Sequence, residues 1–104
     1  MATYALTEKA ILLRGEDDVA IAKAELTAGT VLEEESSRAG DGPQRIEVRQ
    51  DIKPGHKVAR HPVRTGQPVR RYGQVIGFAT QDIAVGDHVH THNLGVGELS
   101  ADRY

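Results

Sequence analysis

Three histidines stand at alternate positions in the stretch GDHVHTHNL, residues 86–94. On an extended strand, alternate side chains point to the same side about 6.6 Å apart, so His90 and His92 can converge on one bound group. His88 and His92 would then lie about 13 Å apart, and a single ion could not contact all three unless the chain bends. Three interpretations stay open: metal ligands, a pocket for an anionic substrate, or the solvated polar face of a strand.

The same stretch contains Asn93, whose amide could join the three imidazoles in donating hydrogen bonds to a carboxylate. Imidazole also titrates near neutral pH, which suits it to proton transfer. The two other histidines receive structural interpretations. His56 follows a turn glycine and caps that turn, whereas His61 precedes Pro62 and belongs to an extended segment.

The charge is unevenly distributed along the chain. Residues 1–41 have net charge −5 and residues 82–104 have net charge −3, whereas residues 44–80 carry eight basic against two acidic side chains, net +6. The basic residues are Arg45, Arg49, Lys53, Lys57, Arg60, Arg64, Arg70 and Arg71. This middle third predicts a basic surface for an anion or an acidic partner, to which Lys57, Arg70 and Arg71 add charge. We expect no nucleic acid, because aromatic residues do not alternate with these charges and the pI is about 6.2.

The composition is that of one small domain. Of the 104 residues, 38% are hydrophobic and only 4% aromatic, so the core must consist of Val, Ile, Leu and Ala. Such a thin core favours self-association or docking onto a larger partner. The absence of cysteine excludes disulfides and thiolate sites. No apolar run approaches the roughly 18 residues of a membrane span and the start does not resemble a signal peptide, so we expect a cytoplasmic protein and no membrane.

A short phrase with a central glycine recurs as LTAGTVL (26–32), IKPGHKV (52–58), VRTGQPV (63–69) and IAVGDHV (83–89). It predicts short strands joined by turns in which glycine supplies a positive φ. Residues 45–52 alternate as a half-buried strand, residues 18–26 contain a strand buried on both faces, and the glycines at 73 and 77 predict bends or close backbone contact. We therefore predict an all-β domain with at most one or two helical turns. Residues 33–44 read as a flexible loop and residues 95–104 as a tail.

The runs IKPGHKVA and YGQVIGFATQDIAVGDHVHTHNL resemble the small N-terminal, SAF-type domain of the altronate/galactarate dehydratase family. The resemblance covers residues 11–94 and implies a single β-clip domain over residues 1–104, of the type III antifreeze-like kind. It departs from the family at position 71, where the family has lysine and this chain has Arg71, which keeps the charge without lysine's capacity to act as a base.

The resemblance also implies a chemistry, the loss of water from a sugar acid to give a 2-keto-3-deoxy acid. Because the chain ends soon after this module, we expect a small lyase subunit that is inactive without a large catalytic subunit. The divalent metal, iron, manganese or magnesium, is expected on that partner and none on this chain. The alternatives are the small subunit of a sulfolactate sulfo-lyase and a non-catalytic anion-binding or protein-binding module. The expected catalytic residues are His90 and His92, and the expected substrate-binding residues are His88, Asn93, Lys57, Arg71 and Tyr72.

Overall fold

The computed structural model describes residues 2–12, 14–34 and 44–95. It is nearly all-β, as predicted, and its single short helix in these residues is one turn long. The elements in chain order are β1 (Thr3–Ala5), α1 (Leu6–Lys9), β2 (Ala10–Ile11), β3 (Val19–Ala22), β4 (Val31–Glu34), β5 (Gln44–Glu47), β6 (Lys57–Ala59), β7 (Pro68–Arg71), β8 (Gln74–Ala79), β9 (His88–Val89) and β10 (Leu94–Gly95). None of the described helical segments is long and apolar enough to cross a membrane.

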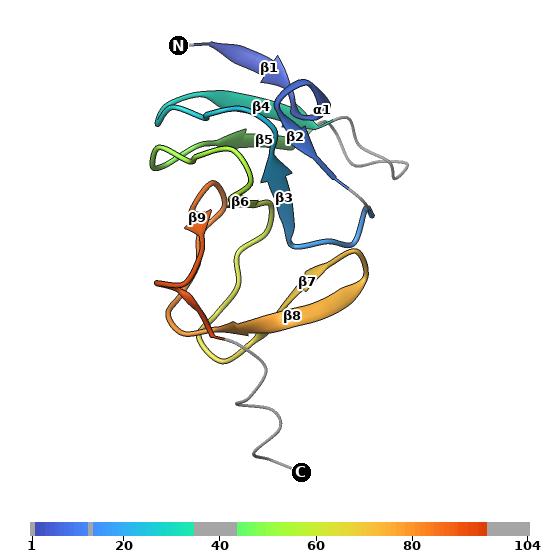
Figure 1. Ribbon diagram of the computed structural model, residues 1–104, viewed down its shortest axis with the longest axis vertical. Helices are drawn as coiled ribbons and strands as arrows, with labels where there is room; N and C mark the ends of the chain where they lie inside the picture. The colour runs from blue at the N-terminus through green and yellow to red at the C-terminus, as the bar shows by residue number, and fades with distance from the viewer. Residues whose placement is uncertain (1, 13, 35–43, 96–104) are drawn as a thin grey trace.

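The strands form three small sheets stacked along the long axis of the molecule (Figure 1). Their strand orders are β1-β4-β5, β2-β3-β6-β9 and β10-β8-β7. β1 runs parallel to β4, and the other pairs are antiparallel. The loop predicted at 33–44 falls largely outside the described residues, since its ends belong to β4 and β5. Of the predicted tail, only Gly95, in β10, is described.

The four-stranded sheet is the middle layer, and a hydrophobic cluster covers each of its two faces. Successive residues of a strand point to opposite sides, and on β3 Val19 belongs to one hydrophobic cluster and Ala20 to the other. The Ala20 cluster extends to Leu32 and Ile46 of β4 and β5. The Val19 cluster extends to Val69 and other side chains of β7 and β8. The strand predicted to be buried on both faces is thus confirmed.

The predicted glycine turns are also confirmed. Gly29, Gly55, Gly66 and Gly86 all adopt a positive φ, between 86° and 94°. Each turn belongs to a longer unit of nine residues. The first residue of the unit is apolar, the fifth is an apolar residue in an isolated β-bridge, and the eighth is the turn glycine. The four units are 22–30, 48–56, 59–67 and 79–87.

The units pair reciprocally, the first with the second and the third with the fourth. In the first pair, the N–H of Gly29 donates to the carbonyl of Val48 at 2.7 Å, and the N–H of Val48 donates to Thr30 at 2.8 Å. In the other direction, the N–H of Gly55 donates to the carbonyl of Ala22 and the N–H of Ala22 donates to the carbonyl of His56, and the third and fourth units repeat the pattern. An isolated β-bridge also joins the two units of each pair, between Leu26 and Ile52 in the first pair and between Val63 and Ile83 in the second. The domain is therefore built as two similar halves.

Two of the turn glycines separate the effect of φ from the effect of packing. A Cβ on Gly55 would meet nothing within 4 Å, whereas a Cβ on Gly86 would lie 1.9 Å from the carbonyl oxygen of Glu47. We expect Gly55→Ala to lower the free energy of unfolding by roughly 1 kcal/mol, the cost of a left-handed residue with a side chain. Gly86→Ala should lower it at least twice as much, because the backbone must also move. Urea unfolding of both variants measures this, and equal losses would contradict it.

Candidate functional site

Four of the five histidines come together on one side of the domain. The ring of His56 stacks on that of His90 with centroids 4.1 Å apart and planes 6° apart. The ring of His88 lies 5.1 Å from that of His56 and 5.3 Å from that of His92. The Nδ1 of His56 is 2.8 Å from the Nε2 of His88, a hydrogen-bond distance. We call these four residues the histidine cluster.

The pairing of β6 with β9 brings His56 into the histidine cluster. Val58 pairs with His88 and Lys57 with Val89, and continuing this register by one residue places His56 opposite His90. The sequence alone predicts only a turn cap for His56 and does not predict this role. The GHK run gives no sign of it, because the contact depends on a pairing between segments about 30 residues apart.

A tight turn after β9 brings His92 back toward His88. The strand ends at Val89, so the straight-strand geometry considered for residues 86–92 is wrong. Asn93 holds the turn: its Oδ1 accepts the N–H of His90 at 2.9 Å, and its Nδ2 donates to the carbonyl of His88 at 2.8 Å. Asn93 is buried, with 3% of its surface exposed. Its side chain therefore positions the histidines through the backbone, while its expected role in substrate binding stays a prediction.

Lys57 adds a positive charge near the histidine cluster, and Arg71 lies near Lys57. Lys57 stands on β6 next to His56, and both its burial and the nearby charge of Arg71 lower its pKa below the ordinary value. Arg71 ends β7, and its Nε is buried without a hydrogen-bond partner among the described residues. The two cations come from different sheets, and their repulsion favours an anion between or beside them.

Burial and positive neighbours act together on the histidines. Burial first, and then the charges of His56, His92, His90 and Lys57, hold the pKa of His88 below its usual range. The pKa of His90 is lowered in the same way, by burial and by His56, Lys57 and His92. The neighbouring charges that lower these two pKa values all come from basic side chains. Burial and positive neighbours thus oppose the protonation of His88 and His90.

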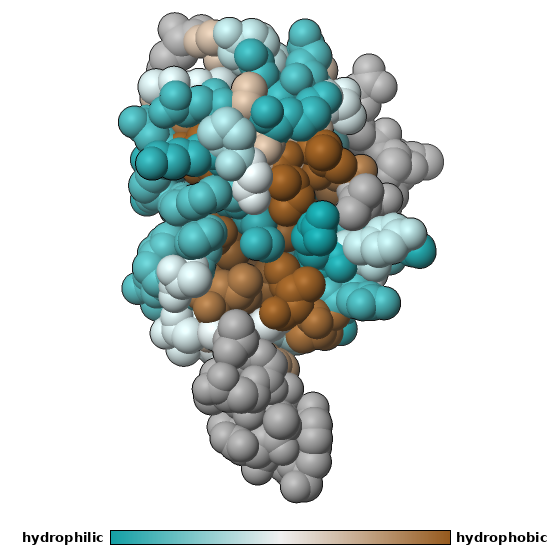
Figure 2. Space-filling model, in the orientation of Figure 1, coloured by the Kyte–Doolittle hydropathy of each residue, from teal (hydrophilic) through white to brown (hydrophobic). Residues whose placement is uncertain are grey.

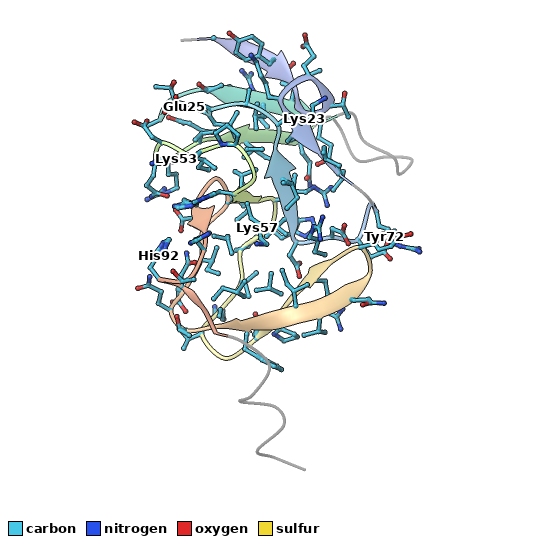
Figure 3. The ribbon with its side chains drawn as sticks, viewed as in Figure 1. Lys23, Glu25, Lys53, Lys57, Tyr72 and His92 are labelled. Atoms are coloured by element: carbon cyan, nitrogen blue, oxygen red, sulfur yellow. The ribbon has the colours of Figure 1, made fainter. Side chains whose placement is uncertain are left out.

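The other predicted site residue, Tyr72, lies elsewhere. It forms the tip of the β7–β8 hairpin with a left-handed φ of 57°, and Figure 3 shows it across the molecule from His92. The Arg14 guanidinium lies 5.0 Å from its ring centroid. The structure therefore brings Lys57 and the three predicted histidines toward one site, places Arg71 near Lys57, and does not bring Tyr72 there.

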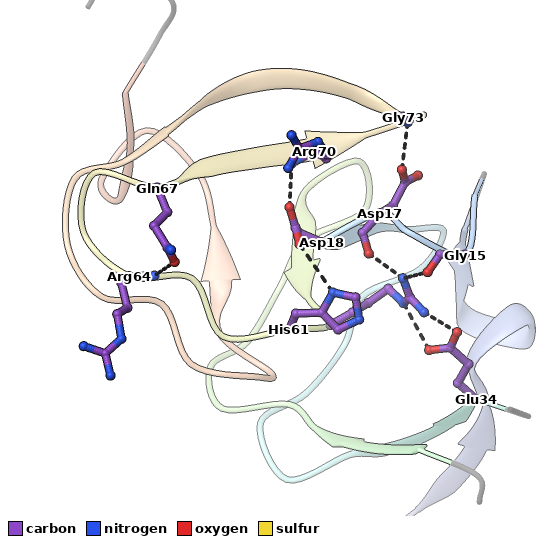
Figure 4. Close-up of polar contacts among 10 residues, drawn as sticks. Gly15, Asp17, Asp18, Glu34, His61, Arg64, Gln67, Arg70 and Gly73 are labelled. Atoms are coloured by element: carbon purple, nitrogen blue, oxygen red, sulfur yellow. Dashed lines mark hydrogen bonds and ion pairs between the residues drawn. The ribbon is translucent and has the colours of Figure 1, made fainter. Parts of the chain in front are cut away.

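A buried polar network holds the β7–β8 hairpin, and with it Arg71, against the rest of the domain (Figure 4). The fully buried carboxylate of Asp17 accepts the N–H groups of Tyr72 at 2.7 Å, Gly73 at 2.9 Å and Arg14 at 3.2 Å. Burial alone would raise the pKa of Asp17, but these hydrogen bonds, assisted by the Arg60 charge, lower it below the usual value. The sequence analysis did not identify Asp17 as a structural residue.

Arg60 is the centre of this network and corrects the prediction that the basic segment lies on the surface. Only 4% of Arg60 is exposed. Its guanidinium forms an ion pair with Glu34 of β4 and donates to the carbonyls of Gly15 and Asp17. Ion pairs to flanking acidic segments also engage Arg45 and Arg49. The excess positive charge of residues 44–80 is therefore partly neutralised by the rest of the chain.

The fold and the site together define an all-β domain that presents a cationic, histidine-rich surface. The chain belongs to the altronate/galactarate dehydratase SAF domain family, whose model matches residues 8–96. It is 37% identical over 94 residues to the altronate dehydratase of Escherichia coli (strain K12), an alignment covering 90% of this chain and 18% of that protein. It is 48% identical over 48 residues to the altronate dehydratase of Bacillus subtilis (strain 168), covering 46% of this chain and 10% of that protein. The chain thus spans less than a fifth of the length of either enzyme.

A second kind of relative is a short subunit. The chain is 45% identical over 49 residues to the (2R)-sulfolactate sulfo-lyase subunit alpha of Paracoccus pantotrophus, covering 47% of this chain and 73% of that subunit. The relatives are therefore of two kinds: long proteins in which the matched part is a small fraction, and a subunit most of which is matched. The names of both kinds of relative describe lyases or dehydratases.

The lowered pKa values predict a stability that depends on pH. Because the folded domain resists protonation of His88, unfolding takes up protons, and the free energy of unfolding falls as the pH drops below the ordinary histidine value of 6.5. Urea midpoints at pH 7.5, 6.5 and 5.5 should decrease in that order. In His88→Gln the decrease should be smaller. A wild-type midpoint that rises on acidification would contradict this sign.

The Asp17 network gives a second prediction. Asp17→Asn keeps the size of the side chain but replaces one accepting oxygen with an NH₂ group that faces backbone donors. We expect a loss of about 1–3 kcal/mol in the free energy of unfolding. Asp51→Asn is the matched control, because exposed Asp51 accepts a single N–H from Ala28. Equal losses in the two variants, measured by urea unfolding at pH 7.5, would contradict the role given to Asp17.

Proposed function

We propose that this domain is the small component of a hydro-lyase that removes water from a sugar acid of the altronate or galactarate type, giving a 2-keto-3-deoxy acid. It supplies substrate-binding and proton-transfer groups to a site that a larger catalytic component completes. The family of the chain and the names of its relatives support this proposal. The observation that carries it is the gathering of four imidazoles beside the positive charge of Lys57, which Arg71 in turn lies near.

The charges of the site suit a carboxylate substrate. Arg71 can bind a carboxylate through two parallel hydrogen bonds, and Lys57 adds a compact charge beside it. As the α proton leaves, negative charge spreads onto the carboxylate oxygens, and fixed cations stabilise this enediolate character. An anion also offsets the repulsion from Arg71, which adds to burial in lowering the pKa of Lys57. Binding and catalysis therefore draw on the same two side chains.

The lowered pKa values suit His88 and His90 to accepting protons. Elimination of a hydroxyl group β to a carboxylate begins with removal of a weakly acidic α proton, which needs a neutral base close to the substrate. A histidine whose pKa lies below its usual range is unprotonated at neutral pH. The expected catalytic role of His90 rests on this property, and that of His92 rests on its place in the histidine cluster and its exposure toward any ligand.

The openness of the site supports a second component. His56, His88 and His90 are half-buried and His92 is exposed, so solvent reaches the histidine cluster. A covering partner would exclude water and strengthen the electrostatic contacts. Figure 2 shows apolar side chains gathered over β2–β3 and over β7–β8, with hydrophilic side chains between them. Ile11 of β2 and Val75 of β8 are 45% and 47% exposed, and apolar surface of this kind favours docking.

The described residues do not fit the family's divalent metal. Across 2–12, 14–34 and 44–95, no three His, Asp or Glu side chains are arranged to hold an ion. His56 and His88 point ring nitrogens at each other, which occupies one nitrogen of each. We therefore derive no step through a metal on this chain, and iron, manganese or magnesium on the larger component stays a prediction.

The similarity to a sulfolactate sulfo-lyase subunit favours one other function, the elimination of sulfite from a sulfonated acid. A sulfonate is also an anion that Arg71 and Lys57 could bind. The two reactions differ in the leaving group. Assaying the same complex for sulfite and for the 2-keto acid product distinguishes them.

Turnover by the reconstituted complex tests the proposed function. We expect no turnover of altronate or galactarate by the chain alone and turnover after addition of the larger component. His90→Gln and His92→Gln should each lower kcat by about tenfold or more, because each removes a proton-transfer group. His61→Gln is the matched control, since His61 lies outside the histidine cluster and contacts Asp18. Unchanged kcat in both cluster variants would contradict the assignment of these residues.

A further inference from the structure

The contact between His56 and His88 has a chemical consequence that the proposed function does not use. Two imidazole nitrogens 2.8 Å apart form a hydrogen bond only if one carries a hydrogen and the other is bare. In the neutral pair, one outer nitrogen is then bare and the outer nitrogen at the opposite end carries a hydrogen. If both rings became fully protonated, two N–H groups would face each other and the bond would be lost.

The surroundings penalise a proton that stays on the pair. The ring of His90 lies over His56 and the ring of His92 lies beside His88, and the charge of Lys57 acts on His88 and His90. All of these groups are cationic when protonated. A base in this position works best if the proton that it accepts is passed on.

The nearest acidic residue along the chain is already occupied. Asp87, which precedes His88, forms an ion pair with Arg49 at 3.0 Å and accepts the N–H of Ala84 at 2.8 Å. Its Oδ1 also accepts a hydrogen bond from Gln50 at 3.3 Å. These contacts direct the carboxylate of Asp87 to other partners. Proton transfer through the pair therefore has to use the two imidazole rings themselves.

We propose that His56 and His88 act as one proton relay, which accepts a proton at the outer nitrogen of one ring and releases a different proton from the outer nitrogen of the other. The inference rests on the proposed function for the identity of the proton donor, an acid with a hydrogen α to its carboxylate. The relay makes His56 a functional residue and explains why the histidine cluster holds two imidazoles at hydrogen-bond distance.

The protons and electrons of the step balance. The α C–H bond breaks, its proton forms an N–H bond at Nδ1 of His88, and its electron pair forms the C=C bond as the β C–O bond breaks. The hydrogen between the rings moves from Nε2 of His88 to Nδ1 of His56, and Nε2 of His56 releases its proton to water. The leaving hydroxide takes up a proton from the same solvent. The sum is the loss of one water, and the pair keeps its number of protons.

The hydrogen bond itself is tested on the full-length chain, independently of any reaction. In uniformly ¹⁵N-labelled protein at pH 7.5, we expect a scalar coupling between Nδ1 of His56 and Nε2 of His88. His92→Gln should retain this coupling and His56→Ala should lack it. A folded wild-type chain without the coupling would overturn the relay, whatever the complex catalyses.

The relay is tested in the reconstituted complex with altronate or galactarate. His56→Gln and His88→Gln should each lower kcat about tenfold or more with KM changed less than about threefold. The double variant should be no slower than the slower single variant, because one broken link already stops the transfer. Millimolar imidazole should partly restore His56→Ala. Independent losses that multiply, without rescue by imidazole, would overturn the relay and leave the proposed function standing. A wild-type complex without turnover would instead contradict the proposed function.

Discussion

The placement of the three sheets depends on the buried guanidinium of Arg60. A charged group out of contact with water is tolerated only when it is paired and its hydrogen bonds are satisfied. Arg60 follows β6 of the middle sheet, its ion-pair partner Glu34 ends β4 of the first sheet, and it donates to the carbonyl of Asp17. The carboxylate of Asp17 then holds the β7–β8 hairpin of the third sheet. All three layers thus meet at one cation.

The histidine cluster lies where the two similar halves of the domain join. β6 follows the second turn unit and β9 follows the fourth, and these two strands pair with each other. His56 stands directly after Gly55 and His88 two residues after Gly86, so comparable places in the two halves supply the two hydrogen-bonded rings. The turn units therefore do more than close the chain, because they align the ends of the two strands that carry the site.

Sequence reasoning succeeded where local chemistry decides the structure. Glycines with positive φ and the alternation around Ile46 both follow from neighbouring residues. It failed where distant segments meet. The entry of His56 into the histidine cluster depends on the β6–β9 register, and the burial of Arg60 depends on a partner 26 residues away. Neither contact leaves a local pattern, and family resemblance pointed to the GHK run without assigning a role to its histidine.

The physical conflict in this domain is a group of basic side chains held close together. Burial first, and then the positive neighbours, lower the pKa of Lys57, His88 and His90, and the repulsion opposes folding whenever these groups are protonated. Two hydrophobic cores and the Arg60 network hold the arrangement in place regardless. A bound anion would relieve this repulsion. Part of the free energy of unfolding that the repulsion removes would therefore contribute to the affinity of the site for that anion. Natural proteins accept such local conflicts chiefly at functional sites. The conflict therefore points to the face that carries the basic side chains, more than to the hydrophobic cores, as the ligand-binding face of the domain.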